Sequence, residues 1–192
     1  MAEEGLATIT ALGARAPRTD RIGNVMITEN PDVALTSVTE RRGHDLAAAR
    51  VLSMPLPGPG GHATCAEGLG ALWLAPGSWM IEAPRRPGDD LAGRVKSAVG
   101  AAASVTDQTD AWVCFDIDAA DAGLLFERLC LLDTRSMDTG CGSRSVIEHI
   151  GCLIICRDRN QRFSVFGPRS SAGSLHHALV AAAAALASGD RP

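Results

Sequence analysis

The sequence predicts an α+β fold, because short segments of alternating hydrophobicity recur along the chain and fewer segments show helical spacing. The chain has 192 residues, of which 46% are hydrophobic and 21% are charged. This balance is typical of a globular protein and excludes a mostly disordered chain. A chain of this length forms one domain or two small ones. Aromatic residues make up only 4% of the chain and tyrosine is absent, so we expect a core built from Ala, Val, Leu and Ile.

The first predicted elements follow an irregular lead-in over residues 1–21, which is rich in Ala, Gly, Arg and Thr. Residues 32–40 alternate and contain many β-branched side chains, which predicts a strand. Residues 44–52 carry apolar side chains at helical spacing, so a short helix is predicted there. The Pro- and Gly-rich run at 55–61 predicts a loop, because proline lacks a backbone donor and glycine frees the backbone.

A hairpin and a helix are predicted next. Residues 71–74 and 79–83 are typical of strands, and Pro76-Gly77 between them suits the two central positions of a type II turn. Residues 89–99 have apolar side chains at helical spacing, which predicts an amphipathic helix.

The clearest alternation of the chain lies at residues 112–118, after a strand that begins at 104–106. The acidic stretch that ends this segment contains only half of the pattern of a calcium-binding loop. We therefore expect Asp118 to be the N-cap of the next helix and Asp121 to lie in its first turn. That helix is predicted to run through Leu129.

Two extended segments, a third strand and a helix are predicted for the rest of the chain. Residues 145–149 and 151–157 are extended, and the second is almost continuously apolar, which is typical of the interior of a sheet. A polar turn leads into a strand at 162–166. The final helix is expected to begin at a cap formed by Ser170 or Ser171.

No catalytic, cofactor-binding or metal-ligating set of residues can be identified in the sequence. The six cysteines include no C-x-x-C pair, so we expect free and mostly buried thiols rather than disulfides or a zinc site. Cys141 and His149 lie in no recognisable nucleophile turn. No glycine-rich phosphate-binding or dinucleotide-binding motif is present.

Charge and hydropathy limit the classes of partner. The formal net charge is −4 and the basic residues form no stripe, which excludes a nucleic-acid partner. The longest apolar tract, at 178–187, is shorter than the ~20 residues that span a bilayer, and the first residues lack the layout of a signal peptide. We expect a cytoplasmic protein with no membrane partner.

Six segments, taken together, indicate a protein family more specifically than any single motif of the chain does. They are Val-Ala-Leu-Thr-Ser-Val at 33–38, Leu-Trp-Leu-Ala-Pro-Gly-Ser-Trp at 72–79, Val-Thr-Asp-Gln-Thr-Asp at 105–110, Cys-Leu-Leu-Asp at 130–133, His-Ile-Gly at 149–151 and the segment 163–179. In order and spacing they resemble the gamma subunit of heterotetrameric sarcosine oxidase. The resemblance implies one gamma-like domain over residues 22–192, with room for two intertwined α+β subdomains. It also implies a fold related to the folate-binding aminomethyltransferases, with ferredoxin-like subdomains in which helices cover one face of an antiparallel sheet.

The function implied by this resemblance is that of a non-catalytic subunit of an oxidoreductase complex acting on CH–NH donors. Complexes of this family oxidatively demethylate sarcosine to glycine and transfer the one-carbon unit to tetrahydrofolate. FAD, FMN, NAD, tetrahydrofolate and zinc are accordingly expected on the partner subunits alpha, beta and delta, and none on this chain.

Trp73, Trp79, Trp112 and Arg169 are the candidate residues for the partner interface, because tryptophan and arginine are enriched among interface anchors. The alternative is that the tryptophans belong to the core of a chain with few aromatics, and that Arg169 is simply an exposed charge. Two other functions stay open, a gamma-like subunit of a related N-methylglutamate dehydrogenase and a stand-alone folate-binding protein.

Overall fold

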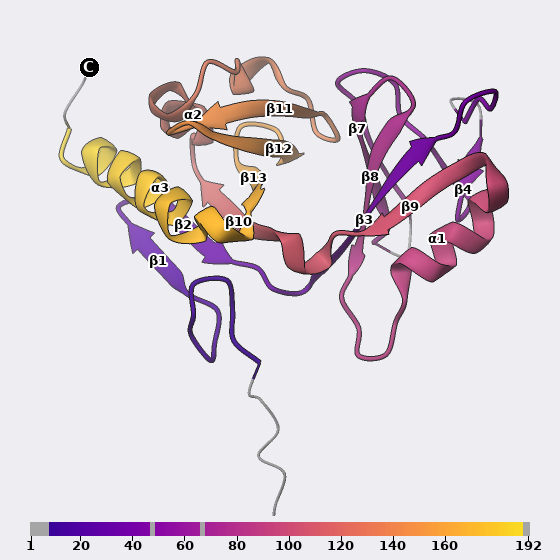
Figure 1. The fold of residues 1–192 in the computed structure, drawn as a ribbon. Helices are drawn as coiled ribbons and strands as arrows, with labels where there is room; N and C mark the ends of the chain where they lie inside the picture. Colours follow the sequence, from indigo (N-terminus) through magenta and orange to yellow (C-terminus); the bar gives the residue numbers. More distant parts are fainter. Residues whose placement is uncertain (1–7, 47–48, 66–67, 190–192) are drawn as a thin grey trace, which may run out of the picture.

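The computed structural model describes residues 8–46, 49–65 and 68–189, and it contains two main antiparallel sheets that lie side by side (Figure 1). The six-stranded sheet is formed by strands within residues 19–29 and 112–168, and the five-stranded sheet is formed by strands within residues 33–107. The chain therefore leaves the first sheet, builds the second and returns. These antiparallel sheets and their few helices confirm the predicted α+β class.

The six-stranded sheet contains, in spatial order, β1 (Thr19–Ile22), β2 (Val25–Glu29), β10 (Trp112–Ala119), β13 (Arg162–Pro168), β12 (Ile150–Asp158) and β11 (Gly142–Ile147). One face is covered by α2 (Ala122–Leu129) and α3 (Ala172–Ala187), whose apolar residues share a buried cluster with those strands. Phe115, Phe126 and Phe163 are at most 1% exposed in this cluster. β12 lies between β11 and β13, as its apolar sequence predicts.

The five-stranded sheet contains, in spatial order, β6 (His62–Thr64), β7 (Gly70–Ala75), β8 (Ser78–Pro84), β3 (Val33–Glu40) and β9 (Ala103–Asp107). The helix α1 (Leu91–Val99) packs Leu91, Val95 and Val99 against one face of this sheet. Gly77 has a φ of +68° in the turn between β7 and β8, as the predicted type II turn requires. Short 3-10 turns lie at Gly100–Ala102, Thr109–Ala111, Thr134–Ser136 and Arg169–Ser171.

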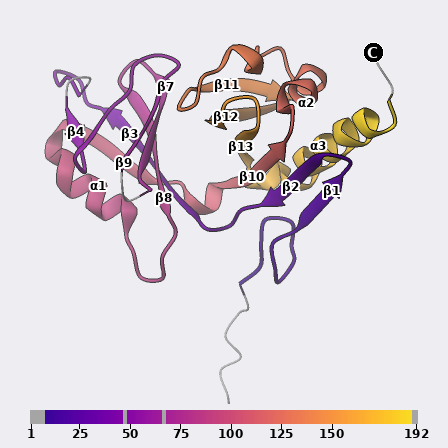
Figure 2. The ribbon, with the colours of Figure 1, turned by 180° about the vertical axis from the view of Figure 1, so that it is seen from behind.

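The two sheets face each other with the faces that the helices leave uncovered, as the view from behind also shows (Figure 2). A third apolar cluster fills this junction. It contains Leu35, Leu72 and Met80 from the five-stranded sheet and Cys114, Leu153, Ile155 and Phe166 from the six-stranded sheet. The result is a helix–sheet–sheet–helix arrangement with a core in each half and one between them.

The helix predicted at residues 44–52 is wrong for the described part of that segment, and residues 47–48 lie outside the described residues. Arg50 and Val51 instead form β4 (Arg50–Val51), which pairs with β5 (Met54–Pro55). Leu46, Val51 and Met54 are buried in the core beside α1. The hairpin buries Val51 and Met54, and Leu46 reaches the same core from the irregular segment before it, so no helix is needed to bury these side chains.

The predicted cap of α2 is also wrong. Asp118 belongs to β10 and pairs in register with Arg162. Asp121 occupies the N-cap position, but its side chain makes no capping hydrogen bond. Asn160, in the turn between β12 and β13, accepts the N–H of Gly123 at 3.1 Å and supplies the cap from another part of the chain.

Two smaller predictions concern the ends of the described chain. The first strand begins at Thr19, so the lead-in predicted to be irregular up to residue 21 already contributes β1. Ser171 is the N-cap of α3, one of the two predicted residues, although its side chain makes no capping hydrogen bond. Within residues 8–46, 49–65 and 68–189, no helix has the length and apolar character needed to cross a membrane.

Candidate functional site

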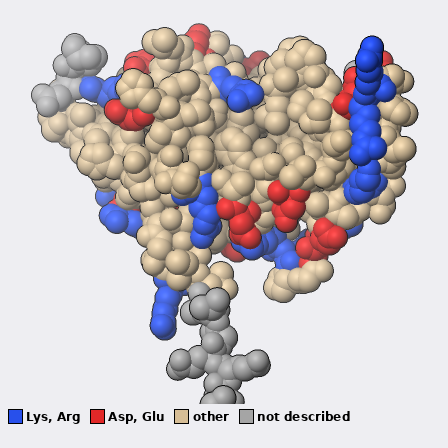
Figure 3. All heavy atoms as spheres, in the orientation of Figure 1, with Lys and Arg blue, Asp and Glu red and all other residues tan. Residues whose placement is uncertain are grey.

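The junction between the two sheets contains two neighbouring cavities, of about 760 and 590 Å³. Asn30, Asp32 and Val33, at the connection from β2 to β3, border both of them. Figure 3 shows acidic and basic side chains gathered close together over the segments that join the two halves. Cavities between packed units are common places for ligand and partner sites, so this junction is the candidate site.

An ion pair between the sheets forms part of the wall of the smaller cavity. Arg157 of β12 donates from Nη1 to Oε1 of Glu82 at 2.6 Å, and from Nη2 to Oε2 at 2.7 Å. Glu82 lies in β8, so this two-point bond joins the two sheets. The Glu82 side chain is 10% exposed and that of Arg157 is 29% exposed. A bidentate bond of this kind fixes the relative position of its two elements as well as adding attraction.

Glu82 has a second buried partner in the same sheet. His62 of β6 places its Nε2 2.7 Å from Oε1 of Glu82, and the His62 side chain is 2% exposed. Gly70 lies beneath both side chains, and a Cβ at this position would be 2.7 Å from Nε2 of His62. Burial favours a raised pKa for the Glu82 carboxyl, but the hydrogen bonds from Arg157 and His62 outweigh it and lower this pKa to about 2. Glu82 is therefore ionised at neutral pH.

The polar contacts continue from Arg157 across the six-stranded sheet. Nε of Arg157 donates to Oγ of Ser164 at 2.9 Å, and Ser164 donates to Oδ1 of Asp116 at 2.6 Å. Asn30 donates from Nδ2 to the other oxygen of Asp116 at 2.7 Å. Both carboxylates of this chain of contacts, Glu82 and Asp116, are thus held by several donors each.

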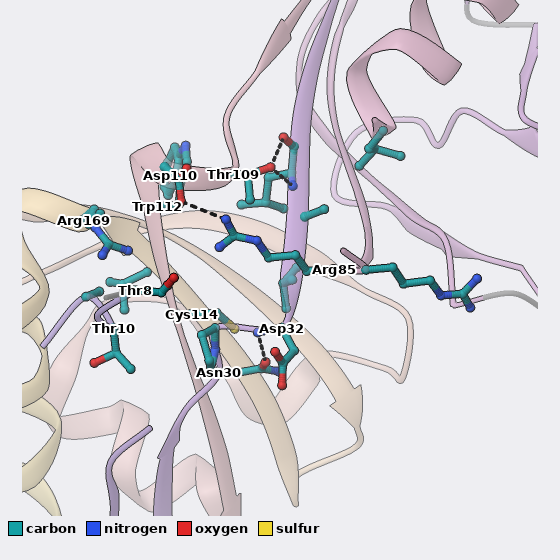
Figure 4. Close-up of a pocket in the computed structure, with 18 of the residues that line it drawn as sticks. Thr8, Thr10, Asn30, Asp32, Arg85, Thr109, Asp110, Trp112, Cys114 and Arg169 are labelled. Carbon is teal, nitrogen blue, oxygen red and sulfur yellow. Dashed lines mark hydrogen bonds and ion pairs between the residues drawn. The ribbon is translucent and has the colours of Figure 1, made fainter. Parts of the chain in front are cut away.

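The larger cavity lies beside the start of β10 (Figure 4). Trp112 forms part of its wall, and Arg85 extends into it from the loop after β8. Nη2 of Arg85 is 3.4 Å from Oδ1 of Asp110, and the two side chains are 44% and 76% exposed. Arg169 donates from Nη2 to the carbonyl oxygen of Ile9 at 3.2 Å, which ties the N-terminal segment to the start of α3.

A buried carboxylate holds the same N-terminal segment along the larger cavity. Glu29 is 2% exposed. Its Oε1 accepts the N–H of Leu12 at 2.9 Å and its Oε2 accepts the N–H of Arg18 at 3.3 Å. The carboxylate therefore holds the polypeptide that surrounds it.

The structure separates the four residues predicted for the partner interface. Trp79 is 2% exposed in the core beside α1, and its indole N–H donates to the carbonyl of Pro57 at 2.8 Å. Its position agrees with the alternative that the tryptophans belong to the core. Trp73 is half-buried at the margin of the same core. Trp112 and Arg169 are half-buried and line the same cavity. The structure thus brings two of the four together.

The cysteines show little sign of nucleophilic chemistry. All six are free; Cys114, Cys152 and Cys156 are buried, whereas Cys65, Cys130 and Cys141 are half-buried. Burial raises the pKa of the Cys152 thiol to about 11 and that of Cys114 well above its ordinary range. A thiol with a raised pKa is a poor nucleophile at neutral pH. In the described part of the chain, His, Cys, Asp and Glu side chains form no cluster of three that could hold a metal ion.

No sequence motif identifies the connected group formed by Glu82, Arg157, Ser164 and Asp116. A signal was present, because Glu82 interrupts the apolar run at 79–83 within β8, and Arg157 follows the apolar run of β12. A charged residue inside a buried strand needs a partner. The identity of that partner, 75 positions away in the case of Glu82 and Arg157, comes only from the fold.

Comparisons with known proteins reveal structural rather than sequence similarity. No family model and no curated protein matches the sequence. A chain of the heterotetrameric sarcosine oxidase from Corynebacterium sp. U-96, solved in complex with pyrrole 2-carboxylate, matches with a TM-score of 0.74 and 20% identity over 85% of each chain. The glycine cleavage system aminomethyltransferase T from Bartonella henselae matches with a TM-score of 0.58 and 13% identity over 79% of this chain. This chain matches 44% of that aminomethyltransferase chain. At these identities the likenesses establish a shared fold.

Proposed function

We propose that this chain is the gamma subunit of a heterotetrameric sarcosine oxidase-type complex. The supporting observation is the reciprocal match to a chain of such an enzyme, which extends over 85% of both chains. Within that complex the chain would support oxidative demethylation of sarcosine to glycine, with transfer of the one-carbon unit to tetrahydrofolate. Its partners would be alpha, beta and delta subunits, and the assembly would work in the cytoplasm.

The role proposed for this chain is non-catalytic. The two carboxylates at the centre of the junction are already engaged, since Glu82 is bound by Arg157 and His62, and Asp116 by Ser164 and Asn30. A general base must instead be free to accept a proton from a substrate. FAD, FMN, NAD, tetrahydrofolate and zinc would accordingly be carried by the partner subunits.

The proposal is tested by expressing the tagged chain alone and together with the flavin-carrying subunits of such a complex. We expect the chain alone to be colourless and inactive, and the joint preparation to elute as one large species with a flavin spectrum and sarcosine-dependent turnover. A coloured chain that oxidises an amine by itself, or a chain that never joins the flavoprotein subunits, would contradict the proposal.

The substrate assay also separates a closely related function. If the same assembly oxidises N-methylglutamate and leaves sarcosine untouched, the chain is instead the gamma-like subunit of an N-methylglutamate dehydrogenase. Oxygen consumption compared with reduction of an artificial acceptor distinguishes an oxidase from a dehydrogenase.

A stand-alone folate-binding protein is the second candidate, because the fold is shared with an aminomethyltransferase and the junction contains cavities of about 760 and 590 Å³. Titration of the purified chain with tetrahydrofolate, followed by calorimetry, distinguishes the two. Saturable binding by the isolated chain favours this second candidate. Binding that needs the partner subunits favours the first.

A further inference from the structure

Side chains on the junction-facing side of the six-stranded sheet form rows that run across its strands. One row consists of Arg144, Leu153, Phe166 and Cys114, which are neighbours in the strand register. Its last three members are buried in the apolar cluster beneath the five-stranded sheet. This row therefore marks where the two sheets are in contact.

The next row, here called the outer row, consists of Val146, Gly151, Pro168 and Trp112. Val146 pairs with Gly151, and Trp112 pairs with Pro168. β12 and β13 are antiparallel, and Leu153 pairs with Phe166. Two residues further along each strand, Gly151 therefore lies beside Pro168 on the same face.

The outer row is apolar and incompletely covered. Val146 is 57% exposed, and a Cβ placed on Gly151 would have no atom within 4 Å. Pro168 and Trp112 are half-buried, and Trp112 packs on the margin of the inter-sheet cluster. The outer row thus continues the buried junction onto the surface as a strip four strands wide.

Two guanidinium groups flank the outer row. Arg144 is exposed on the same face of β11, two residues before Val146, and Arg169 directly follows Pro168. Neither forms an ion pair with another described residue. A complementary surface would therefore present an apolar centre with carboxylates at its edge.

We propose that the outer row is the surface on which the flavin-carrying partner docks, with Trp112 and Val146 as apolar anchors and Arg144 and Arg169 facing acidic side chains. This inference rests on the proposed function and adds to it the face of the chain that meets the partner. An apolar centre with a charged edge is the usual anatomy of a protein interface.

A second copy of this chain fits the outer row less well than a different protein. A two-fold contact between copies sets the same patch against itself. It would set Arg144 and Arg169 of one copy near the same two guanidinium groups of the other, while the neighbouring carboxylates are Glu148 in the turn between β11 and β12 and Asp110, which pairs with Arg85. Like charges opposed across an interface disfavour association.

The experiment uses the tagged chain co-expressed with the flavin-carrying subunits, in three forms. Val146→Asp places a charge in the outer row, and Arg144→Glu reverses the charge at its edge. Leu124→Asp is the matched control, because Leu124 is 42% exposed on α2, which covers the opposite face of the same sheet. We expect Val146→Asp to weaken co-elution with flavin at least ten-fold, Arg144→Glu to weaken it in a salt-dependent manner, and Leu124→Asp to behave as the unaltered chain. Thermal melts verify that all three variants fold.

A photoreactive side chain placed at position 146, and in a parallel sample at 124, gives a second readout that needs no loss of binding. We expect a cross-link to a flavin-carrying subunit from 146 alone. Normal assembly of Val146→Asp, or cross-links from 124 alone, would overturn the docking surface and leave the proposed function intact. An unaltered chain that never joins the flavoprotein would overturn the proposed function and its partner. A cross-link between two copies from 146 would show that a second copy occupies the row.

Discussion

Arg157 and Glu82 join the two sheets through a pair of parallel hydrogen bonds of 2.6 and 2.7 Å, although the residues are 75 positions apart in the chain. The pair lies at one end of a row of polar contacts that extends through Ser164 to Asp116. Apolar packing between the sheets fixes their distance, but it is non-directional. The bidentate pair adds the directional constraint that sets how the two halves are oriented.

Replacing Glu82 by Gln should destabilise the folded chain strongly. The change leaves the Arg157 guanidinium without its counter-charge, and loss of one partner of a buried ion pair costs about 3–5 kcal/mol. We expect a value near the lower end, because the Arg157 side chain is 29% exposed and can regain some hydration. Urea unfolding measures the free energy, with Glu148→Gln at the exposed tip between β11 and β12 as the matched control. Equal midpoints for the two variants would show that the pair contributes nothing.

A double variant separates the ion pair from the cost of stranding one charge. Replacing Arg157 by Met and Glu82 by Gln together removes both charges, so the double variant should be more stable than the sum of the single effects predicts. Additive effects in this cycle would mean that the two side chains do not act as a pair.

Acid should weaken the folded state through Glu82. The pKa of its carboxyl falls from an ordinary value of 4.5 to about 2 in the folded chain, so the unfolded chain takes up the proton first as the pH falls. At 1.36 kcal/mol per unit of pKa, this shift contributes roughly 3 kcal/mol to the free energy of unfolding. The contribution is complete above pH 4.5 and is lost progressively as the pH falls towards 2. Urea titrations at a series of pH values should show this acid limb in the unaltered chain and a flatter one in Glu82→Gln. An identical loss of stability at low pH in the unaltered chain and in Glu82→Gln would contradict the lowered pKa of Glu82.

Replacing Gly70 by Ala should disturb the contact between His62 and Glu82. The added Cβ would lie 2.7 Å from Nε2 of His62 and in conflict with the carboxylate of Glu82. Both side chains are buried, so neither can swing into solvent, and overpacking of this kind costs about 1–3 kcal/mol. Gly151→Ala is the control, because its Cβ would enter open space in another strand. Urea unfolding of the two variants measures the difference, and equal stabilities would mean that His62 and Glu82 shift without cost.

Local pattern predicted most of the fold because strands and helices depend on short-range periodicity. The alternation of β10 correctly places Val113, Phe115 and Ile117 on the face beneath the helices. The same reasoning failed at 44–52, where apolar residues at helical spacing are buried by the hairpin of β4 and β5 instead. It failed again at α2, since the cap that Asp118 was expected to provide comes from Asn160.

The junction was less predictable than the elements that form it. Trp112 and Arg169 were identified as residue types suited to an interface, but only the fold shows that they line one cavity while Trp79 lies in the core. The partner of Glu82 depends on how two sheets meet. The sequence shows only that a charged residue interrupts an apolar strand.

Differences in thiol reactivity should report the packing of the helix-covered core, through Cys152, and of the junction between the sheets, through Cys114. Only the thiolate reacts with iodoacetamide, and burial raises the pKa of the Cys152 thiol to about 11 from an ordinary value of 9. At pH 8 this shift lowers the thiolate fraction of Cys152 roughly 100-fold, so Cys152 should react slowly. Burial and the nearby Asp116 raise the pKa of the Cys114 thiol well above its ordinary range. Cys114 should therefore also react more slowly than the half-buried Cys65. Peptide mass spectrometry over a time course measures each rate, and the same reaction in urea, where all six cysteines are exposed, gives the reference. Rapid labelling of Cys114 in the folded chain would mean that the junction between the sheets opens readily, contrary to a closed contact held by Arg157 and Glu82.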